Sequence, residues 1–286
     1  KRGKVAEPTR AAYINEAVCE GCGDCGEKSS CLSVQPVETE FGRKTVIHQS
    51  SCNKDFTCLD GDCPAFIEVV AGGAVPEKST LAIAEIAEGQ PEPDRLDEGN
   101  VLMIGIGGTG VVTVNQLLAT AALLDGKEAH GLDQTGLAQK GGPVVSNLKI
   151  RRPDGELELG EANKIATGEA DAYIVFDLLS GTNPANLEKA MPGRTVALVS
   201  SSKVPTGAMV RDTSAEYPEW SALQDSIDSA TVAEKNVYYD AGTLSDNLFR
   251  SHMPANIIVL GSAYQSGVVP ISAAAIERAI ELNGVA

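Results

Sequence analysis

The chain has 286 residues, a formal net charge of −16 and an aromatic content of only 4%. A strongly acidic chain of this kind is not expected to bind nucleic acid or an anionic membrane surface. Its apolar stretches all fall short of the ~20 residues that a membrane-spanning helix needs, so we expect no membrane partner. The length suits one large domain or two ordinary ones.

All seven cysteines lie between residues 19 and 63. An odd count in one short stretch does not suit a secreted disulfide framework. With no recognisable signal peptide, it indicates metal ligands in a reducing compartment, the cytoplasm. Short strands are expected at 12–15 and 46–48, each leading into a cysteine run. This duplication is typical of small bacterial ferredoxin-like modules with two clusters, which we predict for residues 1–71.

The first run places Cys19, Cys22 and Cys25 at intervals of three residues, and a remote cysteine, Cys63, is followed by proline. Three thiolates at this spacing can surround a corner of an iron–sulfur cube. In the bacterial ferredoxin pattern the fourth thiolate belongs to the other run. We therefore predict a [4Fe-4S] cluster on Cys19, Cys22, Cys25 and Cys63, with zinc as the alternative metal.

The first three ligand positions of the second run correspond to those of the first, except that Asp55 stands where the second cysteine is expected. With one cysteine donated by the first run, the predicted ligands of the second cluster are Cys31, Cys52, Asp55 and Cys58. A carboxylate is a harder ligand than a thiolate and binds iron more weakly. We therefore expect a carboxylate-bound [4Fe-4S] cluster or a [3Fe-4S] cluster with a vacant corner. The alternative is that Asp55 caps a short turn.

From residue 72 to 99 the composition shifts to proline, glutamate and glycine, which indicates an acidic linker with a brief extended piece at 81–83. In residues 100–286 strand and helix patterns alternate. This favours a Rossmann-like α/β domain with an open, mostly parallel sheet. Its strands are expected at 101–104, 144–150, 173–176, 195–200, 237–239 and 257–260, and its helices at 111–124, 185–190, 222–234 and 272–282.

A glycine-rich loop, Gly105-Ile-Gly-Gly-Thr-Gly110, joins the first strand and helix of that domain. Bare glycines allow a phosphate to approach the helix N-terminus, whose N–H groups and dipole attract anions. A second turn, Lys140–Gly142, carries a cation and either reaches the same phosphates or is structural. Asp133 lies about where a dinucleotide fold has its ribose-binding acid. NAD or FAD, another phosphate-bearing ligand and a ligand-free turn all stay open.

The three histidines, His48, His130 and His252, show no mutual spacing suited to a metal, and we expect each to be structural or exposed. No Ser/His/Asp or Cys/His nucleophile set stands out, so no catalytic residue is expected on this chain. Asp177 follows an expected strand, and it either faces a ligand crevice or caps the next turn.

Six segments resemble parts of the indolepyruvate ferredoxin oxidoreductases, which belong to the 2-oxoacid:ferredoxin oxidoreductase family. The segments EAVCEGCGDC (16–25), LSVQPVET (32–39) and SCNKD (51–55) resemble the ferredoxin segment of these long fused enzymes. Three further segments resemble the gamma domain that follows in those enzymes, namely GIGGTG (105–110), GLDQTGLAQKGG (131–142) and SAAAIERAIELNG (272–284).

The resemblance implies an enzyme that uses thiamine diphosphate and magnesium to decarboxylate an aryl or branched 2-oxoacid. Such enzymes pass electrons singly through [4Fe-4S] clusters to soluble ferredoxin and transfer the acyl group to coenzyme A. By this likeness, the phosphates of coenzyme A would be cradled by Gly105, Gly107, Gly108, Thr109, Gly110, Lys140, Gly141 and Gly142.

The sequence lacks the thiamine diphosphate motif, GDG followed by a metal-binding Asn. We therefore expect a fragment or one subunit, with thiamine diphosphate and magnesium in partner domains, and a homo-oligomeric assembly. Two other functions stay open. One is a ferredoxin module fused to an NAD- or FAD-binding reductase domain, and the other is a regulatory α/β domain with a structural zinc module.

Overall fold

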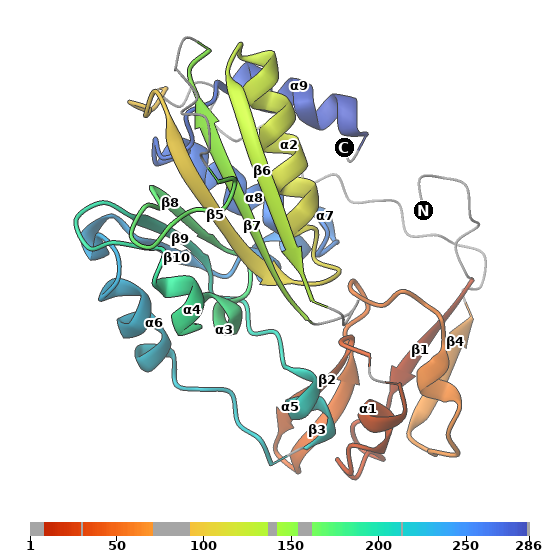
Figure 1. The fold of residues 1–286 in the computed structure, drawn as a ribbon. Helices are drawn as coiled ribbons and strands as arrows, with labels where there is room; N and C mark the ends of the chain where they lie inside the picture. The colour runs from red at the N-terminus through yellow and green to blue at the C-terminus, as the bar shows by residue number, and fades with distance from the viewer. Residues whose placement is uncertain are drawn as a thin grey trace. The chain divides into compact units, whose positions relative to one another are not determined.

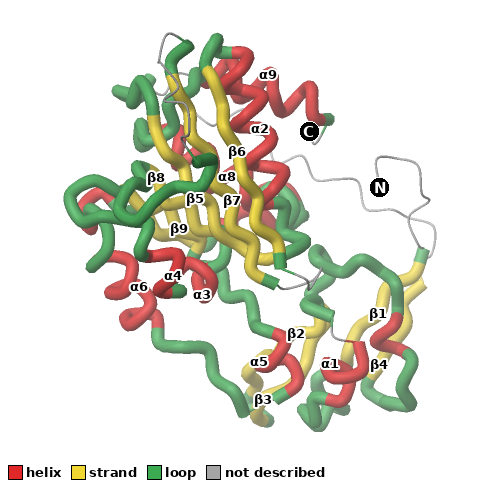
Figure 2. The backbone as a smooth tube through the Cα atoms, viewed as in Figure 1, coloured by secondary structure: helices red, strands yellow, loops and turns green. Residues whose placement is uncertain are grey.

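The computed structural model describes residues 9–29, 31–70, 92–136, 142–153, 162–212 and 214–284. These residues form two compact units, whose helices and strands are shown in Figures 1 and 2. The first unit holds the cysteine-rich residues together with Val204–Tyr217 and Asp246–His252. The second unit holds the other described residues from 92 onward. The domain limits expected from the sequence stay a prediction. They do not include these two short segments in the cysteine-rich part.

Two small antiparallel sheets form the frame of the first unit. Each strand that leads into one cysteine run pairs with the strand that follows the last cysteine of the other run. The strands expected at 12–15 and 46–48 are thereby confirmed, with slightly earlier bounds. The pairs are β1 (Arg10–Ile14) with β4 (Phe66–Val70), and β3 (Gly42–Ile47) with β2 (Val34–Thr39).

The apolar cluster between these sheets is very small, with only Ala12, Ile14, Ile47 and Ala65 fully buried in it. Cysteines of both runs pack against this cluster. Units with so little buried apolar surface usually need a metal or disulfides to hold their fold. The short elements of this unit are α1 (Asp24–Ser29), the 3-10 turn η1 (Thr57–Leu59) and α5 (Gly207–Arg211).

A close contact joins α1 to α5 within the first unit. A Cβ atom added at Gly26 would lie 2.4 Å from the Val210 side chain. A distance of this kind excludes any side chain at that position, so glycine is required for the two helices to approach.

The second unit contains a six-stranded sheet within the described residues, in the order β10-β9-β8-β5-β7-β6. The four strands from β10 to β5 are parallel, whereas β7 is antiparallel to β5 and β6 is antiparallel to β7. The predicted open α/β sheet is confirmed. Its strands are β5 (Gly99–Ile106), β6 (Glu128–Thr135), β7 (Pro143–Arg151), β8 (Ala172–Val175), β9 (Val196–Ser200) and β10 (Val237–Tyr239).

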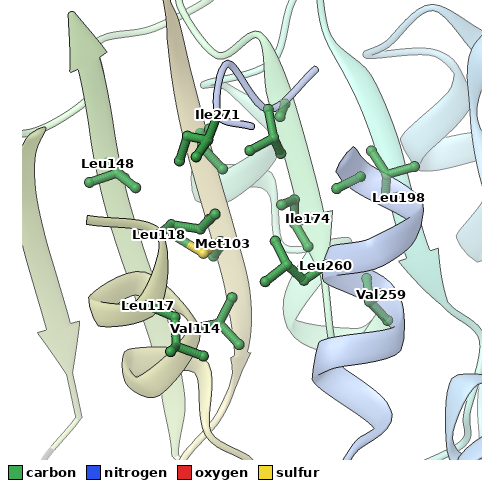
Figure 3. Close-up of a cluster of buried hydrophobic side chains, with 14 of the residues drawn as sticks. Met103, Val114, Leu117, Leu118, Leu148, Ile174, Leu198, Val259, Leu260 and Ile271 are labelled. Carbon is green, nitrogen blue, oxygen red and sulfur yellow. The ribbon is translucent and has the colours of Figure 1, made fainter. Parts of the chain in front are cut away.

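Strand β5 is buried along its whole length. Val101 and Met103 belong to the same apolar cluster as buried residues of three helices, and Figure 3 shows this core. Those helices are α2 (Val111–Leu124), α8 (Ala255–Gln265) and α9 (Ala273–Asn283), and the remaining ones are α3 (Leu178–Gly181), α4 (Pro184–Leu187), α6 (Trp220–Asp228), the 3-10 turn η3 (Ala233–Lys235) and α7 (Ala241–Phe249). Within the described part of the chain, no helix is both long and apolar enough to cross a bilayer.

Three sequence assignments in this unit need correction. The strand expected at 257–260 is wrong, because these residues lie inside α8, where Ala255, Val259 and Ala263 are buried at helical spacing. The helices expected at 185–190 and 222–234 are shorter in the structure, as α4 and α6. The linker piece expected at 81–83 lies outside the described residues.

Asp177 caps a helix, which was one of its two possible roles. Its side chain is buried, and its Oδ2 accepts a hydrogen bond from the Ser180 N–H at 2.8 Å at the start of α3. Burial raises the pKa of this carboxyl group, while the bonds from Ser180 lower it to a smaller extent. The group therefore favours its protonated form more in the folded than in the unfolded chain.

Replacing Asp177 by alanine is expected to lower the free energy of unfolding by about 1 kcal/mol, because the cap is lost. Asp177→Asn keeps the cap without a buried charge. Because the folded pKa is raised, the stability contributed by Asp177 is lost as the pH rises above its usual value of 3.8. As the pH rises above this value, the urea midpoint of the wild type should therefore fall relative to that of Asp177→Asn. Equal midpoints for the Asn and Ala variants would contradict the capping role.

Candidate functional site

The two cysteine runs share positive φ angles at corresponding positions. In the first run, Gly21 and Gly23 have φ angles of +71° and +79°. At the two corresponding positions of the second run, Lys54 and Phe56 have φ angles of +56° and +61°. Glycine adopts positive φ readily, whereas other residues do so at a cost of about 1–2 kcal/mol. The second loop therefore keeps the shape of the first without the residues that favour it.

The same hydrogen bond closes both loops. The Gly21 N–H donates to the Sγ atom of Cys19 at 3.4 Å, and the Lys54 N–H donates to the Sγ atom of Cys52 at 3.4 Å. A donor aimed at sulfur favours the thiolate, which is the form that binds a metal. The duplication inferred from cysteine spacing is thus present in backbone angles and in hydrogen bonds.

The last cysteine of each run lies beside the strand that leads into the other run. The Asn15 N–H donates to the carbonyl of Ala65, two residues after Cys63, at 2.8 Å. In the same way, the His48 N–H donates to the carbonyl of Ser33, two residues after Cys31, at 2.7 Å. The backbone therefore brings each of these cysteines towards the opposite run.

The electrostatic neighbours of the cysteines divide in the same way. Burial is the main factor that raises the pKa of the Cys25 thiol, and Cys19 and Cys22 add to the rise as charged neighbours. Burial also raises the pKa of Cys58 to about 11, with smaller additions from Cys31, Cys52 and, least, Asp55. Two groups of ligand-type side chains result, each with a partly buried thiol whose ionisation a nearby positive charge would favour.

The spacing of the sulfur atoms bears on the choice of metal. Four sulfurs around one zinc ion, with bonds of about 2.3 Å, lie about 3.8 Å apart. Within the described residues, which include all seven cysteines, no three cysteines have their sulfurs within 4.8 Å of one another. Zinc and a larger cluster both stay open as the occupant of the cysteine groups.

Asp55 is exposed, and its carboxylate bonds to its own turn. It accepts hydrogen bonds from the side-chain amide of Asn53 at 2.9 Å and from the backbone N–H and hydroxyl of Thr57 at 3.2 and 3.0 Å. These bonds begin the η1 turn. Asp55 nevertheless lies at the backbone position that Cys22 has in the first loop, between two residues with positive φ.

The glycine loop between β5 and α2 contains two kinds of glycine. A Cβ atom on Gly105 would lie 2.6 Å from the Val111 side chain and 3.2 Å from that of Phe176, so this glycine serves helix–strand packing. Gly108 has a φ of +91°, and a Cβ atom there would meet nothing within 4 Å. It is exposed just before the N-terminus of α2. Open space at this place is what an incoming phosphate requires.

The chain fixes the loop through hydrogen bonds from distant residues. The Gly107 N–H donates to the Gly142 carbonyl at 2.8 Å, and the Asn256 side-chain amide donates to the Thr109 carbonyl at 2.7 Å. Thr109 also bonds through its hydroxyl to the Ile106 carbonyl. The structure thus brings Gly142 to the loop as expected, while Lys140 and Gly141 lie outside the described residues.

The surroundings of Asp133 differ from those of a ribose-binding acid. Its Oδ1 accepts hydrogen bonds from the Asn115 side chain on α2 at 2.8 Å and from the Ser146 hydroxyl on β7. In a dinucleotide-binding fold, the strand that follows the first helix lies parallel and next to the first strand. Here β7 occupies that place and is antiparallel to β5. This topology disfavours the alternative of an NAD or FAD site.

The structure also assembles a group that the sequence reasoning missed. His48, Asp246 and His252 bring one ligand atom each to within 4.8 Å of the others, although all three histidines were expected to be structural or exposed. No local spacing could reveal this group, because His48 lies far from Asp246 and His252 in the sequence. His130, by contrast, pairs with Glu128 in the second unit.

Comparisons with known proteins agree with the motifs. Residues 100–284 match the pyruvate ferredoxin/flavodoxin oxidoreductase family. The indolepyruvate oxidoreductase subunit IorB of Archaeoglobus fulgidus is 24% identical over 181 residues, which make up 63% of this chain and 83% of that protein.

Among solved structures, pyruvate oxidoreductase subunit PORC of Thermotoga maritima matches with a TM-score of 0.47 and 18% identity, over 66% of this chain and 86% of that one. The gamma subunit of a keto/oxoacid ferredoxin oxidoreductase from Geobacter sulfurreducens matches with a TM-score of 0.40 and 20% identity, over 64% and 84% of the two chains. Because the family match covers more than half of the sequence, this chain belongs to the pyruvate ferredoxin/flavodoxin oxidoreductase family.

Proposed function

We propose that this chain is the electron-transfer and coenzyme A-binding portion of a thiamine diphosphate-dependent 2-oxoacid:ferredoxin oxidoreductase. One observation carries the proposal: two cysteine loops of the same shape precede a segment that matches this family of oxidoreductases. The relative named indolepyruvate oxidoreductase subunit IorB supports an aryl 2-oxoacid such as indolepyruvate as the substrate. Thiamine diphosphate and magnesium would lie in partner domains or another subunit of a homo-oligomeric enzyme.

The proposed ligands of the first [4Fe-4S] cluster are Cys19, Cys22, Cys25 and Cys63. Those of the second cluster are Cys31, Cys52, Asp55 and Cys58. The strand pairing supports this exchange, because each remote cysteine enters beside the opposite run. When bound, such clusters accept and release single electrons, which suits delivery to a soluble ferredoxin.

We assign the second site to [4Fe-4S] or, with Asp55 beside a vacant corner, to [3Fe-4S]. The protein's own contribution is to aim N–H groups at the Cys19 and Cys52 sulfurs and to shield Cys25 and Cys58 partly from solvent. Hydrogen bonds to sulfur and low solvent access are the means by which a chain adjusts the potential of a cluster.

Coenzyme A is proposed to bind with its phosphates at the loop Gly105–Gly110 and the turn Lys140–Gly142. The N-terminus of α2 supplies a partial positive charge, and Gly108 leaves room for the phosphates. An overall charge of −16 repels an anionic ligand, so a cation such as Lys140 near the loop would matter more than in a neutral protein.

The first test concerns the exchange of cysteines. Cys19→Ala and Cys63→Ala should abolish the same cluster signal in electron paramagnetic resonance spectra of the reduced protein. Cys31→Ala and Cys52→Ala should abolish the other. Each variant should lose about half of the iron and acid-labile sulfide, and the cluster that survives serves as the folding control. Loss of one common signal in Cys63→Ala and Cys52→Ala would contradict the assignment.

The second test separates a ligand role of Asp55 from a turn role. Asp55→Asn can accept the same bonds from Thr57, so it keeps the turn but provides a much weaker metal ligand. We expect Asp55→Asn and Asp55→Ala to favour a three-iron spectrum and Asp55→Cys to give a four-iron cluster that resists oxidation. If the Asn variant matches the wild type while only the Ala variant changes, Asp55 is a turn residue.

The third test concerns coenzyme A. Aspartate tolerates positive φ better than most residues, so Gly108→Asp should keep the loop while placing bulk and negative charge where phosphate is proposed. We expect coenzyme A affinity, measured by calorimetry, to fall at least about tenfold, or about 1.4 kcal/mol.

Gly126→Asp is the matched control for this test. Gly126 also has a positive φ with open space around its Cβ position, but it follows the opposite end of α2. Coenzyme A affinity should be unchanged there, whereas Lys140→Ala should weaken binding most at low salt. Unchanged affinity in both Gly108→Asp and Lys140→Ala would leave the loop as a structural turn.

A further inference from the structure

We propose that His48, Asp246 and His252, here called the His–Asp–His triad, form a binding site for a divalent transition-metal ion of the zinc type. Their ligand atoms lie within 4.8 Å of one another, and all three residues belong to the first unit. His48 follows β3, Asp246 lies in α7, and His252 lies three residues after that helix ends. The site is separate from the cysteine groups and does not rest on the proposed function.

The distance between His48 and Asp246 fits two ligands of one ion better than a hydrogen bond. The His48 Nε2 and Asp246 Oδ2 atoms are 3.4 Å apart, beyond the 2.7–3.2 Å usual for a hydrogen bond with a nitrogen donor. In a tetrahedral zinc site with bonds of about 2.0–2.2 Å to nitrogen and oxygen, neighbouring ligand atoms lie about 3.4 Å apart. The pair already has this separation.

The second carboxylate oxygen of Asp246 gives independent support. Oδ1 is buried and has no hydrogen-bond partner among the residues that the structure describes. A buried carboxylate oxygen without a partner lowers the free energy of unfolding, because nothing compensates the loss of its hydration. An ion in contact with the carboxylate would remove that cost, whichever oxygen binds it.

The hydrogen bonds of His48 leave its Nε2 atom available to a metal. The Nδ1 atom lies 2.9 Å from the Ser51 hydroxyl, which in turn donates to Ser33 or to the His48 carbonyl. If Ser51 accepts from an Nδ1–H group, Nε2 carries the lone pair. This arrangement matches metal-binding histidines, whose other ring nitrogen usually donates to a fixed acceptor. The Ser50 hydroxyl, 3.3 Å from Nε2, would turn away from a bound ion.

The ligand set determines the class of ion. Two imidazoles and one carboxylate suit zinc and similar transition metals, whereas calcium and magnesium prefer sites made only of oxygen. Three protein ligands leave a fourth position for water. The His48 and Asp246 side chains are 31% and 33% exposed, so an ion can reach them from solvent. The ion would link Asp246 and His252 to His48, which follows β3 and lies four residues before Cys52.

The test is zinc binding by the complete chain, purified without oxygen so that its iron stays in place. After dialysis against zinc and removal of the excess, we expect about one zinc per chain. X-ray absorption at the zinc edge should show nitrogen and oxygen neighbours at about 2.0–2.2 Å and no sulfur at about 2.3 Å. Absence of retained zinc would overturn the proposal without affecting the proposed function. A sulfur shell in place of the nitrogen and oxygen neighbours would indicate zinc at the cysteines and would contradict both.

Variants locate the site. His252→Gln and Asp246→Asn should each weaken zinc binding at least tenfold, with the iron content unchanged. His130→Gln is the matched control, because His130 Nε2 lies 3.5 Å from Glu128 Oε2 in a similar pair, and the described residues offer no third ligand there. Zinc affinity unchanged in His252→Gln, or reduced equally in His130→Gln, would refute the site.

Discussion

The fold of the cysteine-rich unit depends on two backbone loops that must hold their sulfur atoms at fixed positions around a very small apolar core. Four buried apolar side chains form that core, and the cysteines pack directly against it. A cluster of this size offsets only a small part of the conformational entropy that the ordered residues of the unit lose on folding. The proposed clusters would therefore contribute to folding as well as to electron transfer, because ligand bonds replace the missing core.

The α/β unit obtains its stability in a different way. Strand β5 is buried along its length, and it ends in a loop whose first glycine packs against both α2 and the end of β8. The rigid sheet thereby fixes the start of α2, and distant residues tie down the loop through Gly142 and Asn256. A phosphate site at this place would be assembled before any ligand arrives, so binding would cost little ordering entropy.

The sequence was informative wherever a local pattern carried the signal. The spacing of cysteines revealed the duplicated loops and the aligned position of Asp55, and the apolar runs located most strands. Strand β6 escaped detection because it lies at a sheet edge and none of its residues is buried, so it shows no apolar alternation. The run at 257–260 was misassigned because a short apolar stretch fits a buried strand and a buried helix equally well.

Contacts between distant segments could not be predicted in this way. Nothing local marks 204–217 or 246–252 as partners of the cysteine-rich residues, and the His–Asp–His triad arises only from that association. One hint existed in Gly26, where a glycine inside a short helix indicates that another backbone approaches closely. Without the structure, the approaching residue, Val210, could not have been named.

The positive φ angles of Lys54 and Phe56 bear on the order in which the two loops can form. The first loop has glycines at these positions, so its shape costs little before any metal arrives. The second loop is strained, so additional contacts are needed to keep its conformation. One such contact is the Arg10 guanidinium, whose Cζ atom lies 4.2 Å from the centroid of the Phe56 ring. Without a bound cluster, the second loop would therefore release more strain energy by relaxing than the first loop would. If the proposed clusters are present, maturation of the unit would then be directional, because the glycine-containing loop would form first and the strained loop would close after it.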